Sequence, residues 1–281
     1  MTLVKMSKLL SPIRDNSYAI GAFNVSNMEM TMGAVKAAEE LQAPLLLQIA
    51  ESRLAYSPLS VLGPLMLAAA RQASVPVAVH LDHGTTWETI EMALKLGFTS
   101  VMFDGSKYPL KQNIAMTRKI KELCNSYGAE IEGEVGCIGG AKETYSEDEL
   151  LTTVEGAEQF IEETGVDALA IGIGTAHGHY TQKPKLHIGR LKEIASVVEC
   201  PLVLHGGTGL TREDFWDCIH HGIRKINIAT ASYDSVAAYI RNTAAVKRDA
   251  GYFDFSTAAV EGTYKNVKKY MRLFGMEGKV K

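Results

Sequence analysis

The sequence predicts an α/β protein built as a single (β/α)₈ barrel, a TIM barrel, with additional C-terminal helices. Eight short apolar segments recur along the chain, and segments with helical spacing separate them. Most of the eight are near-continuous apolar runs, which is typical of parallel strands covered on both faces. A length of 281 residues suits one such barrel, which usually takes about 250 residues. An open, doubly wound sheet is the alternative arrangement of the same elements.

The predicted strands run through the whole chain, and no Pro-, Gly- or Ser-rich linker interrupts them. We therefore expect one domain over residues 1–281. In order, the strands are expected at 18–24, 44–51, 76–83, 100–106, 130–136, 168–174, 201–207 and 225–230. Before them, Leu3, Met6, Leu9 and Leu10 have the spacing of a short amphipathic helix.

The segments between the strands carry helix signals. Ser26 with Glu29 has the spacing of a capping box, and Thr211 with Asp214 opens a later helix. Two more helices are expected after the last strand, at 232–249 and 260–274. The longest polar insert follows the fifth strand, at 139–153, and its length predicts a mobile lid or binding loop.

Composition argues against several classes of partner. The formal net charge is −3 and no long basic or acidic run occurs, so neither nucleic acid nor a membrane is an expected partner. No stretch approaches the roughly 20 apolar residues of a membrane span, and the first residues lack the apolar core of a secretion signal. The four cysteines form no C-x-x-C pair, which indicates free thiols in a reducing compartment. We therefore expect a cytoplasmic protein.

Polar residues follow the predicted strands at their carboxyl ends. In a barrel these ends meet at one rim, and catalytic groups lie on the loops that follow them. Ordinary turns favour Gly, Asn, Asp and Ser, whereas three histidines and several carboxylates are more than turn chemistry requires. The strand-end residues are Asn24, Glu51, Asp82, His83, Asp104, Glu134, His177, His205 and Asn227.

Three of the eight histidines follow three separate strands, which makes His83, His177 and His205 candidate metal ligands. Three histidines with an open fourth position form a catalytic zinc arrangement. Taken singly, each histidine is more often structural or solvated, and it is the barrel that brings these three together. His80 lies inside a strand and is expected to be a hydrogen-bonded core residue.

Gly-rich turns follow the seventh and eighth strands, in "HGGTGLTRED" and "NIATASYD". Loops at these two places often bind phosphate in such barrels, because backbone N–H groups and a helix N-terminus face the anion. The alternative is a tight strand-to-helix turn that needs glycine anyway. The candidates for phosphate binding are Gly207, Thr208, Asn227, Ala229 and Thr230.

Asp82 precedes the candidate ligand His83, so it is placed to act as a general acid or base on a hydroxyl of a metal-bound substrate. The alternative is a carboxylate that orients a metal ligand through a hydrogen bond. Asp104 and Glu134 end neighbouring strands, where they would hold a second metal position or orient the ligands of the first.

At these residues the chain resembles a class II, metal-dependent ketose-bisphosphate aldolase, a family that includes fructose- and tagatose-bisphosphate aldolases. The combination of "HLDHG", "AHG" and "LHGGTG" is specific. Further matching stretches run in order from residue 18 to residue 230, and "LFGMEGK" is a family-like tail, so the resemblance covers nearly the whole chain. These stretches are "YAIGAFNV", "DGS", "EGEVGCIGG", "IGIGTAHGHY" and "KINIAT".

The resemblance implies roles for most of these residues. It implies one Zn²⁺ bound by His83, His177 and His205, and Asp82 as the acid/base at the C4 hydroxyl of the substrate. Asp104 and Glu134 would line the metal site or its alternative position. The remaining positions would be Asn24 at the reacting centre, Gly178 and Gly206 near a monovalent cation (Na⁺ or K⁺), and Gly207, Thr208, Asn227, Ala229 and Thr230 at the phosphate of dihydroxyacetone phosphate. A homodimer or homotetramer is expected, because relatives are dimers or tetramers.

Three departures from the family pattern bear on the substrate. The loop that often reads G-G-x-E-D in relatives is "GGAKETYSED" here, so Lys142 stands at the expected Glu. Glu143 would replace it as the catalytic residue after a one-residue shift, with Glu147 or Asp148 as alternatives. A late D-P-R segment, whose Arg helps to grip the distal phosphate in relatives, is absent, and a Ser after the second strand is Ala50 here.

The expected function is reversible retro-aldol cleavage of a ketose 1-phosphate or ketose bisphosphate to dihydroxyacetone phosphate and an aldehyde. The alternative is the same chemistry on a ketose 1-phosphate whose distal end is a sulfonate or carboxylate. An example is 6-deoxy-6-sulfofructose 1-phosphate, which would give sulfolactaldehyde. Arg53 is the candidate partner of that distal group, and a solvated loop residue is the other interpretation of Arg53.

Three rival functions share some of these features. A Schiff-base aldolase would use a barrel lysine, but Lys225 precedes "INIAT" and is expected at the wrong end of the barrel. A metal-dependent phosphosugar epimerase or isomerase also needs a stabilised enediolate. A non-catalytic sugar-phosphate sensor would use the same pocket without turnover.

Overall fold

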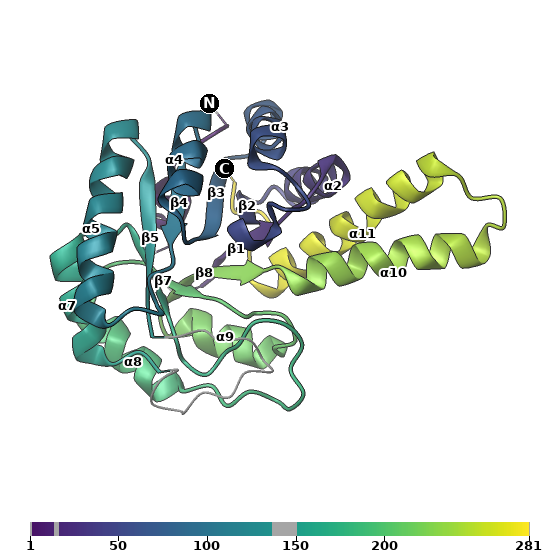
Figure 1. The fold of residues 1–281 in the computed structure, drawn as a ribbon. Helices are drawn as coiled ribbons and strands as arrows, with labels where there is room; N and C mark the ends of the chain where they lie inside the picture. The colour runs from purple at the N-terminus through teal and green to yellow at the C-terminus, as the bar shows by residue number, and fades with distance from the viewer. Residues whose placement is uncertain (1, 14–16, 137–150, 281) are drawn as a thin grey trace.

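Eight parallel strands close into a barrel in the order of the sequence, and β1 pairs with both β2 and β8 (Figure 1). The structure is a computed structural model that describes residues 2–13, 17–136 and 151–280. The predicted barrel is confirmed, and the open sheet is excluded because the first and last strands are hydrogen-bonded.

Each predicted strand segment overlaps one strand, although β8 begins two residues before its predicted segment and β3 ends one residue after. In the described chain every strand residue is buried except His83 and Arg224, as expected for strands that side chains cover on both faces. The strands are β1 (Ile20–Asn24), β2 (Leu45–Ala50), β3 (Val77–Gly84), β4 (Ser100–Phe103), β5 (Glu130–Val135), β6 (Ala168–Ile171), β7 (Leu202–Leu204) and β8 (Ile223–Ile228).

Helices between successive strands surround the barrel (Figure 1). They are α2 (Met28–Glu40), the short 3₁₀ helix η1 (Glu51–Arg53), α3 (Leu59–Gln72), α4 (Trp87–Leu96), α5 (Leu110–Tyr127), α7 (Val154–Thr164), α8 (Ile188–Val197) and α9 (Arg212–His220). The predicted insert at 139–153 falls mostly outside the described residues. Among the described residues, no helix combines the length and apolar character needed to cross a membrane.

The predicted helix caps are partly confirmed. Thr211 and Asp214 form the expected capping box of α9. The box predicted from Ser26 and Glu29 is wrong, because Asn27 caps α2. Ser26 instead donates its hydroxyl to the hydroxyl oxygen of Tyr233, 3.0 Å away. Adjacent residues compete for a cap, and the path of the chain out of β1 decides between them.

Both termini of the chain cover the amino ends of the strands. The predicted N-terminal helix is confirmed as α1 (Met6–Leu10), but Leu3 lies before it and bridges to Val77 of β3. The amide of Ser7 donates to the carboxylate of Glu130 at the start of β5. After the last helix, Phe274 is fully buried and its carbonyl oxygen accepts from the amide of Ala19. The chain therefore covers the amino ends of the strands, and a cavity is expected at their carboxyl ends.

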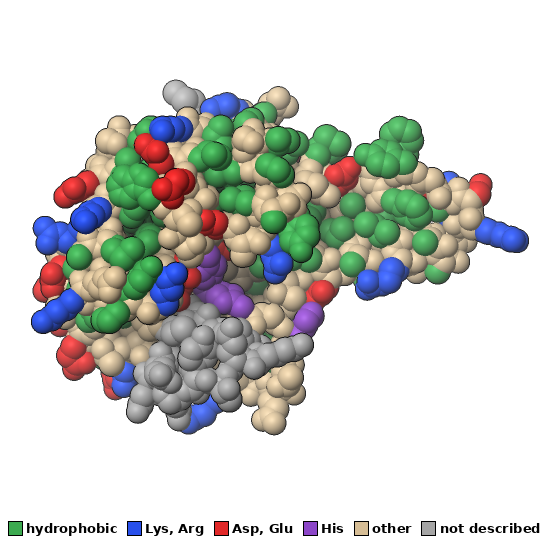
Figure 2. All heavy atoms as spheres, viewed as in Figure 1, with side chains coloured by type: hydrophobic (Ala, Val, Ile, Leu, Met, Phe, Trp, Pro, Cys, Tyr) green, Lys and Arg blue, Asp and Glu red, His purple; other side chains and the backbone are tan. Residues whose placement is uncertain are grey.

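The last two helices, α10 (Thr230–Val246) and α11 (Tyr252–Leu273), form a hairpin that projects from the barrel (Figure 1). The expected start of the final helix at 260 is wrong, because Asp254 accepts from the amide of Gly251 and caps an earlier start. Near the tip, Val246, Tyr252 and Phe253 are 79%, 73% and 81% exposed. Apolar side chains on this arm are visible in Figure 2.

Candidate functional site

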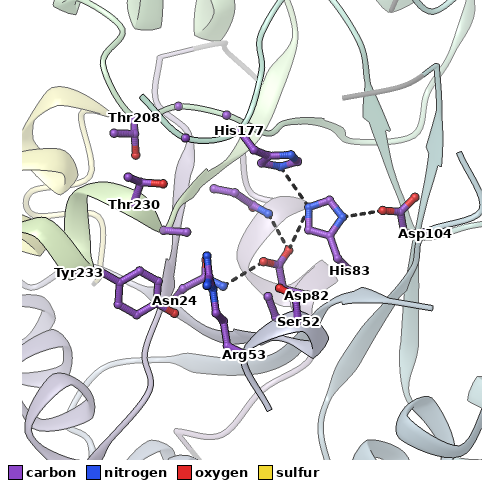
Figure 3. Close-up of a pocket in the computed structure, with 16 residues that line it drawn as sticks. Asn24, Ser52, Arg53, Asp82, His83, Asp104, His177, Thr208, Thr230 and Tyr233 are labelled. Atoms are coloured by element: carbon purple, nitrogen blue, oxygen red, sulfur yellow. Dashed lines mark hydrogen bonds and ion pairs between the residues drawn. The ribbon is translucent and has the colours of Figure 1, made fainter. Parts of the chain in front are cut away.

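A cavity of about 450 Å³ lies at the carboxyl ends of the strands (Figure 3). That volume is within the usual range for a small-molecule site. The residues that line it are Asn24, Ala50, Ser52, Arg53, Asp82, His83, Asp104, His177, Gly178, Gly206, Gly207, Thr208, Asn227, Ala229, Thr230 and Tyr233. The candidate catalytic, metal and substrate residues line it, except His205 and Glu134, which are buried beside it. Glu143 and its alternatives Glu147 and Asp148 lie outside the described residues.

Asp82 and His83 are consecutive in β3, yet both face the cavity. Successive side chains of a regular strand point to opposite faces. Here His83 has a φ of 45°, and the pairing of β3 with β4 shifts register between Leu81 and Gly84. The left-handed backbone turns the imidazole toward the rim, a conformation that costs roughly 1–3 kcal/mol and that recurs at active sites.

The three predicted histidines meet at this rim. Nε2 of His83 lies 2.9 Å from Nδ1 of His205 and 3.2 Å from Nε2 of His177. A tetrahedral zinc with Zn–N bonds of 2.0–2.1 Å would separate its nitrogens by about 3.3 Å. The spacing of these nitrogen atoms therefore fits a metal ion, and His83, Asp104 and Glu134 form a second group that could hold one.

In two of these rings, the nitrogen that points away from the other histidines contacts a carboxylate. Nδ1 of His83 lies 2.8 Å from Oδ2 of Asp104, and Nε2 of His205 lies 2.8 Å from Oε1 of Glu132. In a neutral ring, the N–H group donates a hydrogen bond to the carboxylate, and the opposite ring nitrogen keeps its lone pair for a metal. This is the usual support of metal-binding histidines. Asp104 therefore orients His83, which was one of its two predicted roles.

The charge distribution at the rim favours a bound cation. Burial disfavours a charged His83, but the carboxylates of Asp82 and Asp104 outweigh it and raise its pKa to about 10. Burial would raise the pKa of Asp82, yet the neighbouring His83 and Lys225 hold it below its ordinary value. For His205, burial together with the charges of His83 and Lys225 lowers the pKa far below the usual range. A neutral imidazole beside ionised carboxylates is a metal-ligand environment.

Asp82 is held by two amides. Its Oδ2 accepts from Nδ2 of Asn24 at 2.9 Å, and its Oδ1 accepts from Nδ2 of Asn227 at 3.0 Å. Nε2 of Gln48 donates in turn to Oδ1 of Asn24, which fixes the orientation of that amide. Asp82 is 4% exposed, so it faces the cavity in one defined position.

The loops after β6, β7 and β8 form the wall of the cavity that faces Ser52 and Arg53 of η1. Gly206 has a φ of 70°, and a Cβ atom there would lie 2.5 Å from the carbonyl oxygen of Ala176. Glycine thus allows the β6 and β7 loops to approach closely. The hydroxyl of Thr208 accepts from the amide of Ala231, and Thr208 and Thr230 lie together at the start of α10 (Figure 3).

Several residues at the site were not predicted from the sequence. Ser52 and Tyr233 line the cavity, and Tyr180 donates to the carbonyl oxygen of Gly206 at 2.8 Å. Glu132 was also missed, although an acidic residue within an apolar strand is a signal of a buried polar contact.

Lys225 lies closer to the cavity than its sequence position suggests. It is fully buried, and its Nζ atom donates to Oδ1 of the cavity residue Asn227 at 2.7 Å and pairs with Glu132 at 2.8 Å. Its backbone pairs with Ile20, the first residue of β1, as expected for a position toward the amino end of the barrel, and only its side chain reaches toward the cavity. Its ammonium group is nevertheless held beneath the cavity floor rather than in the cavity. His80 is the expected core residue, with Nδ1 at 2.8 Å from the hydroxyl of Ser100.

Arg53 lies on η1 at the mouth of the cavity. Its guanidinium carbon is 5.8 Å from the centre of the Tyr233 ring, within the range of a cation–π contact. The side chain is exposed, and within the described chain no carboxylate forms an ion pair with it. It is therefore placed to meet an anionic ligand.

Comparisons with known proteins agree with this site. A family model described as fructose-bisphosphate aldolase class-II matches residues 4–279. A Bacillus subtilis (strain 168) protein named a probable fructose-bisphosphate aldolase is 37% identical over 255 residues, which are 89% of each chain. The fructose-bisphosphate aldolase of Staphylococcus aureus (strain Mu50 / ATCC 700699) is 33% identical over 288 residues and covers 100% of both chains.

Among solved structures, the YdjI aldolase from Escherichia coli K12 is similar, with a TM-score of 0.90 and 30% sequence identity. The match covers 99% of this chain and 100% of that chain. The present chain belongs to the class-II fructose-bisphosphate aldolase family. It is therefore an aldehyde-lyase, an enzyme that cleaves a carbon–carbon bond to release an aldehyde.

One strand-end carboxylate serves the scaffold instead of the cavity. Glu51 accepts from the amides of Thr85 and Thr86, at 2.5 and 3.2 Å, at the N-terminus of α4. Partial burial opposes ionisation of Glu51, but these hydrogen bonds outweigh it and lower its pKa. Glu51 thus joins the end of β2 to the turn that follows His83.

We expect Glu51→Gln to lower the free energy of unfolding at pH 7 by about 1 kcal/mol, because the side chain is partly exposed and solvent screens its bonds. Since the folded pKa is lowered, the stabilisation is present above the unfolded value of about 4.3 and is lost as pH falls through the folded value. Urea unfolding of both proteins from pH 7 to pH 3 should therefore show a gap that closes in acid.

Glu88 provides the control. It lies in the first turn of the same helix and is exposed, so Glu88→Gln should change stability by less than half as much. Parallel stability curves for wild type and Glu51→Gln across the whole pH range would contradict the assignment.

Proposed function

We propose that this chain catalyses the reversible cleavage of a ketose 1-phosphate or ketose bisphosphate to dihydroxyacetone phosphate and an aldehyde. One observation carries the proposal: His83, His177 and His205 meet beside Asp82 at the mouth of the barrel. Three imidazoles with an open position, next to a carboxylate, are what a metal-assisted aldol reaction requires.

Zinc is the proposed metal, with the inner nitrogens of the three histidines as its ligands. A bound zinc supplies Lewis-acid stabilisation of the negative charge that develops on the carbonyl oxygen as the bond breaks. Asp104 and Glu132 keep the rings of His83 and His205 in place for it. Gly178 and Gly206 are proposed to lie near a monovalent cation, Na⁺ or K⁺.

Asp82 is the proposed base for cleavage. It would take the proton from the C4 hydroxyl as the bond between C3 and C4 breaks and C4 becomes the aldehyde carbon. The electron pair of that bond passes to the C2 carbonyl, and the resulting enediolate takes a proton at C3. The two amides on Asp82 hold the carboxylate as an acceptor. Glu143, with Glu147 or Asp148 as alternatives, is the proposed proton donor to C3.

The phosphate of dihydroxyacetone phosphate is proposed to bind at the start of α10. This helix has 17 residues, and its N-terminal N–H groups and dipole favour an anion. The residues around that position are Gly207, Thr208, Asn227, Ala229 and Thr230. Asn24 would contact the reacting centre, since it already bonds to Asp82.

Removal of the metal and of the base should have separate effects. A chelator should abolish cleavage, and added zinc should restore it. Asp82→Asn should lower kcat by about 10³-fold, within the usual range for a general acid/base, while the bound zinc is retained. Zinc content by atomic absorption and turnover of a ketose phosphate would be measured on the same samples.

The histidine pair in "AHGHY" supplies a matched control. His177→Gln should lose zinc, whereas His179→Gln should keep zinc and turnover, because His179 is 69% exposed and pairs with Asp234. Full activity in a metal-stripped enzyme, or full turnover by Asp82→Asn, would refute the proposed mechanism. Isomerised sugar in place of cleaved products would favour the rival epimerase or isomerase.

We further propose that Arg53 binds an anionic group at the aldehyde end of the substrate, either a phosphate or the sulfonate or carboxylate of the alternative substrate. Arg53→Met should lower kcat/KM by about 10- to 100-fold for substrates with an anionic distal end, as expected for loss of a charge-assisted hydrogen bond. Fructose 1-phosphate, whose distal end is neutral, should be cleaved equally by both proteins.

The distal group itself is settled by substrate preference. Fructose 1,6-bisphosphate and 6-deoxy-6-sulfofructose 1-phosphate would be compared with the wild-type enzyme. A clear preference for the bisphosphate would end the sulfonate alternative. Equal losses by Arg53→Met on charged and neutral substrates would show that Arg53 has another role.

We also propose a cytoplasmic homodimer or homotetramer in which a second copy covers the tip of the α10–α11 hairpin. The exposed side chains of Val246, Tyr252 and Phe253 support this, because a monomer leaves them in water. Phe253→Glu should reduce the molar mass measured by light scattering, whereas Tyr127→Glu on α5 should not. A wild-type protein that is monomeric at micromolar concentration would contradict this proposal.

A further inference from the structure

A buried ion pair lies directly beneath the proposed metal site. Nζ of Lys225 on β8 is 2.8 Å from Oε2 of Glu132 on β5, and both side chains are fully buried. Burial of two charges is costly unless further hydrogen bonds satisfy them, and a pair of apolar residues is often as stable. The contacts that each partner makes on its other side therefore indicate its role.

Glu132 contacts the proposed metal ligand His205. Its Oε1 atom lies 2.8 Å from Nε2 of that ring. Nδ2 of Asn227 is also near this nitrogen, at 3.2 Å, but it already donates to Asp82. The contact with the carboxylate is shorter, and an ionised carboxylate can only accept a hydrogen bond. The ring proton therefore belongs on Nε2, toward Glu132, and the lone pair on Nδ1 faces His83.

Lys225 contacts the amide that holds the proposed base. Its ammonium group only donates, so its 2.7 Å contact with Asn227 identifies that atom as the amide oxygen. The NH₂ group of Asn227 is then turned toward Oδ1 of Asp82, 3.0 Å away. A flipped amide would present its oxygen to the Asp82 carboxylate and repel it.

We propose that Glu132 and Lys225 form a positioning pair, which aligns the metal ligand His205 through one partner and the acid/base Asp82 through the other. The proposal rests on the proposed function of this site. One ion pair thus sets the orientation of two functional groups, His205 directly after β7 and Asp82 near the end of β3. His80 is another polar neighbour, but its Nε2 lies 3.8 Å from Oε2 of Glu132, which is too far for a hydrogen bond.

The decisive variant changes both partners. Removal of one charge would leave the other buried and unpaired, so either single variant could fail to fold. Glu132→Gln combined with Lys225→Met removes both charges and nearly preserves the volume. The control combines Asp167→Asn with Lys121→Met, which removes another Lys–carboxylate pair with a 2.7 Å contact. Asp167 also accepts from the amide of Ile131, and among the described residues no hydrogen bond or ion pair joins this pair to Asp82 or to the three candidate metal ligands.

Zinc affinity is measured first, by competition with a chromophoric chelator. The Glu132/Lys225 double variant should bind zinc about 10- to 100-fold more weakly than wild type, the usual cost of losing the carboxylate partner of a metal-binding histidine. The neutral Gln amide can present either its oxygen or its NH₂ group to Nε2 of His205, so it no longer fixes the ring proton. The control should stay within twofold of wild type. Long-range ¹H–¹⁵N spectra of the histidine rings should show the Nε2–H form of His205 in wild type and a changed tautomer population in the double variant.

Turnover is then measured with zinc at saturation, so that the metal effect is removed. The Glu132/Lys225 variant should lose about tenfold in kcat with little change in KM, because Asp82 is no longer held in one orientation. Zinc affinity within twofold of wild type, or an unchanged saturated kcat, would overturn the proposal. A wild-type enzyme that binds no zinc would instead refute the proposed function itself.

Discussion

The site depends on the meeting of three imidazole nitrogens, with Nε2 of His83 at the centre. The two nearest nitrogens, on His205 and His177, lie 2.9 and 3.2 Å from it. Such atoms attract one another only with a proton or a cation between them, and further contacts fix the orientation of the rings. Asp104 and Glu132 provide those contacts at the outer nitrogens. The barrel supplies the convergence, since each ring comes from a different strand end.

The backbone at His83 adopts an unfavourable conformation that brings its ring to the other two histidines. A regular β3 would send His83 away from the cavity that Asp82 faces, because side chains alternate along a strand. The left-handed φ of 45° and the register shift before Gly84 place both side chains at the rim. Asp82 and His83 can therefore have different roles while they are neighbours in sequence, one held by amides and the other by Asp104.

Much of this could be predicted from the sequence. Near-continuous apolar runs identified the strands, and the polar residues at their ends identified the rim, because the carboxyl ends of barrel strands meet in one place. The cap at Asn27 was missed, since neighbouring polar residues compete for a helix N-terminus. Glu132 and Lys225 were not recognised as partners, because their contact crosses the barrel interior between β5 and β8. No local pattern encodes such a distance.

The sequence by itself determined the barrel, the three histidines and the glycine-rich loops, because apolar periodicity and strand-end chemistry are local properties. The tertiary structure alone decided which nitrogen of each ring faces the others, how the Asn227 amide is turned and which carboxylate supports which histidine. These features depend on distances between residues far apart in the chain. A hydrogen bond forms at about 3 Å or not at all, so only the folded arrangement can assign it.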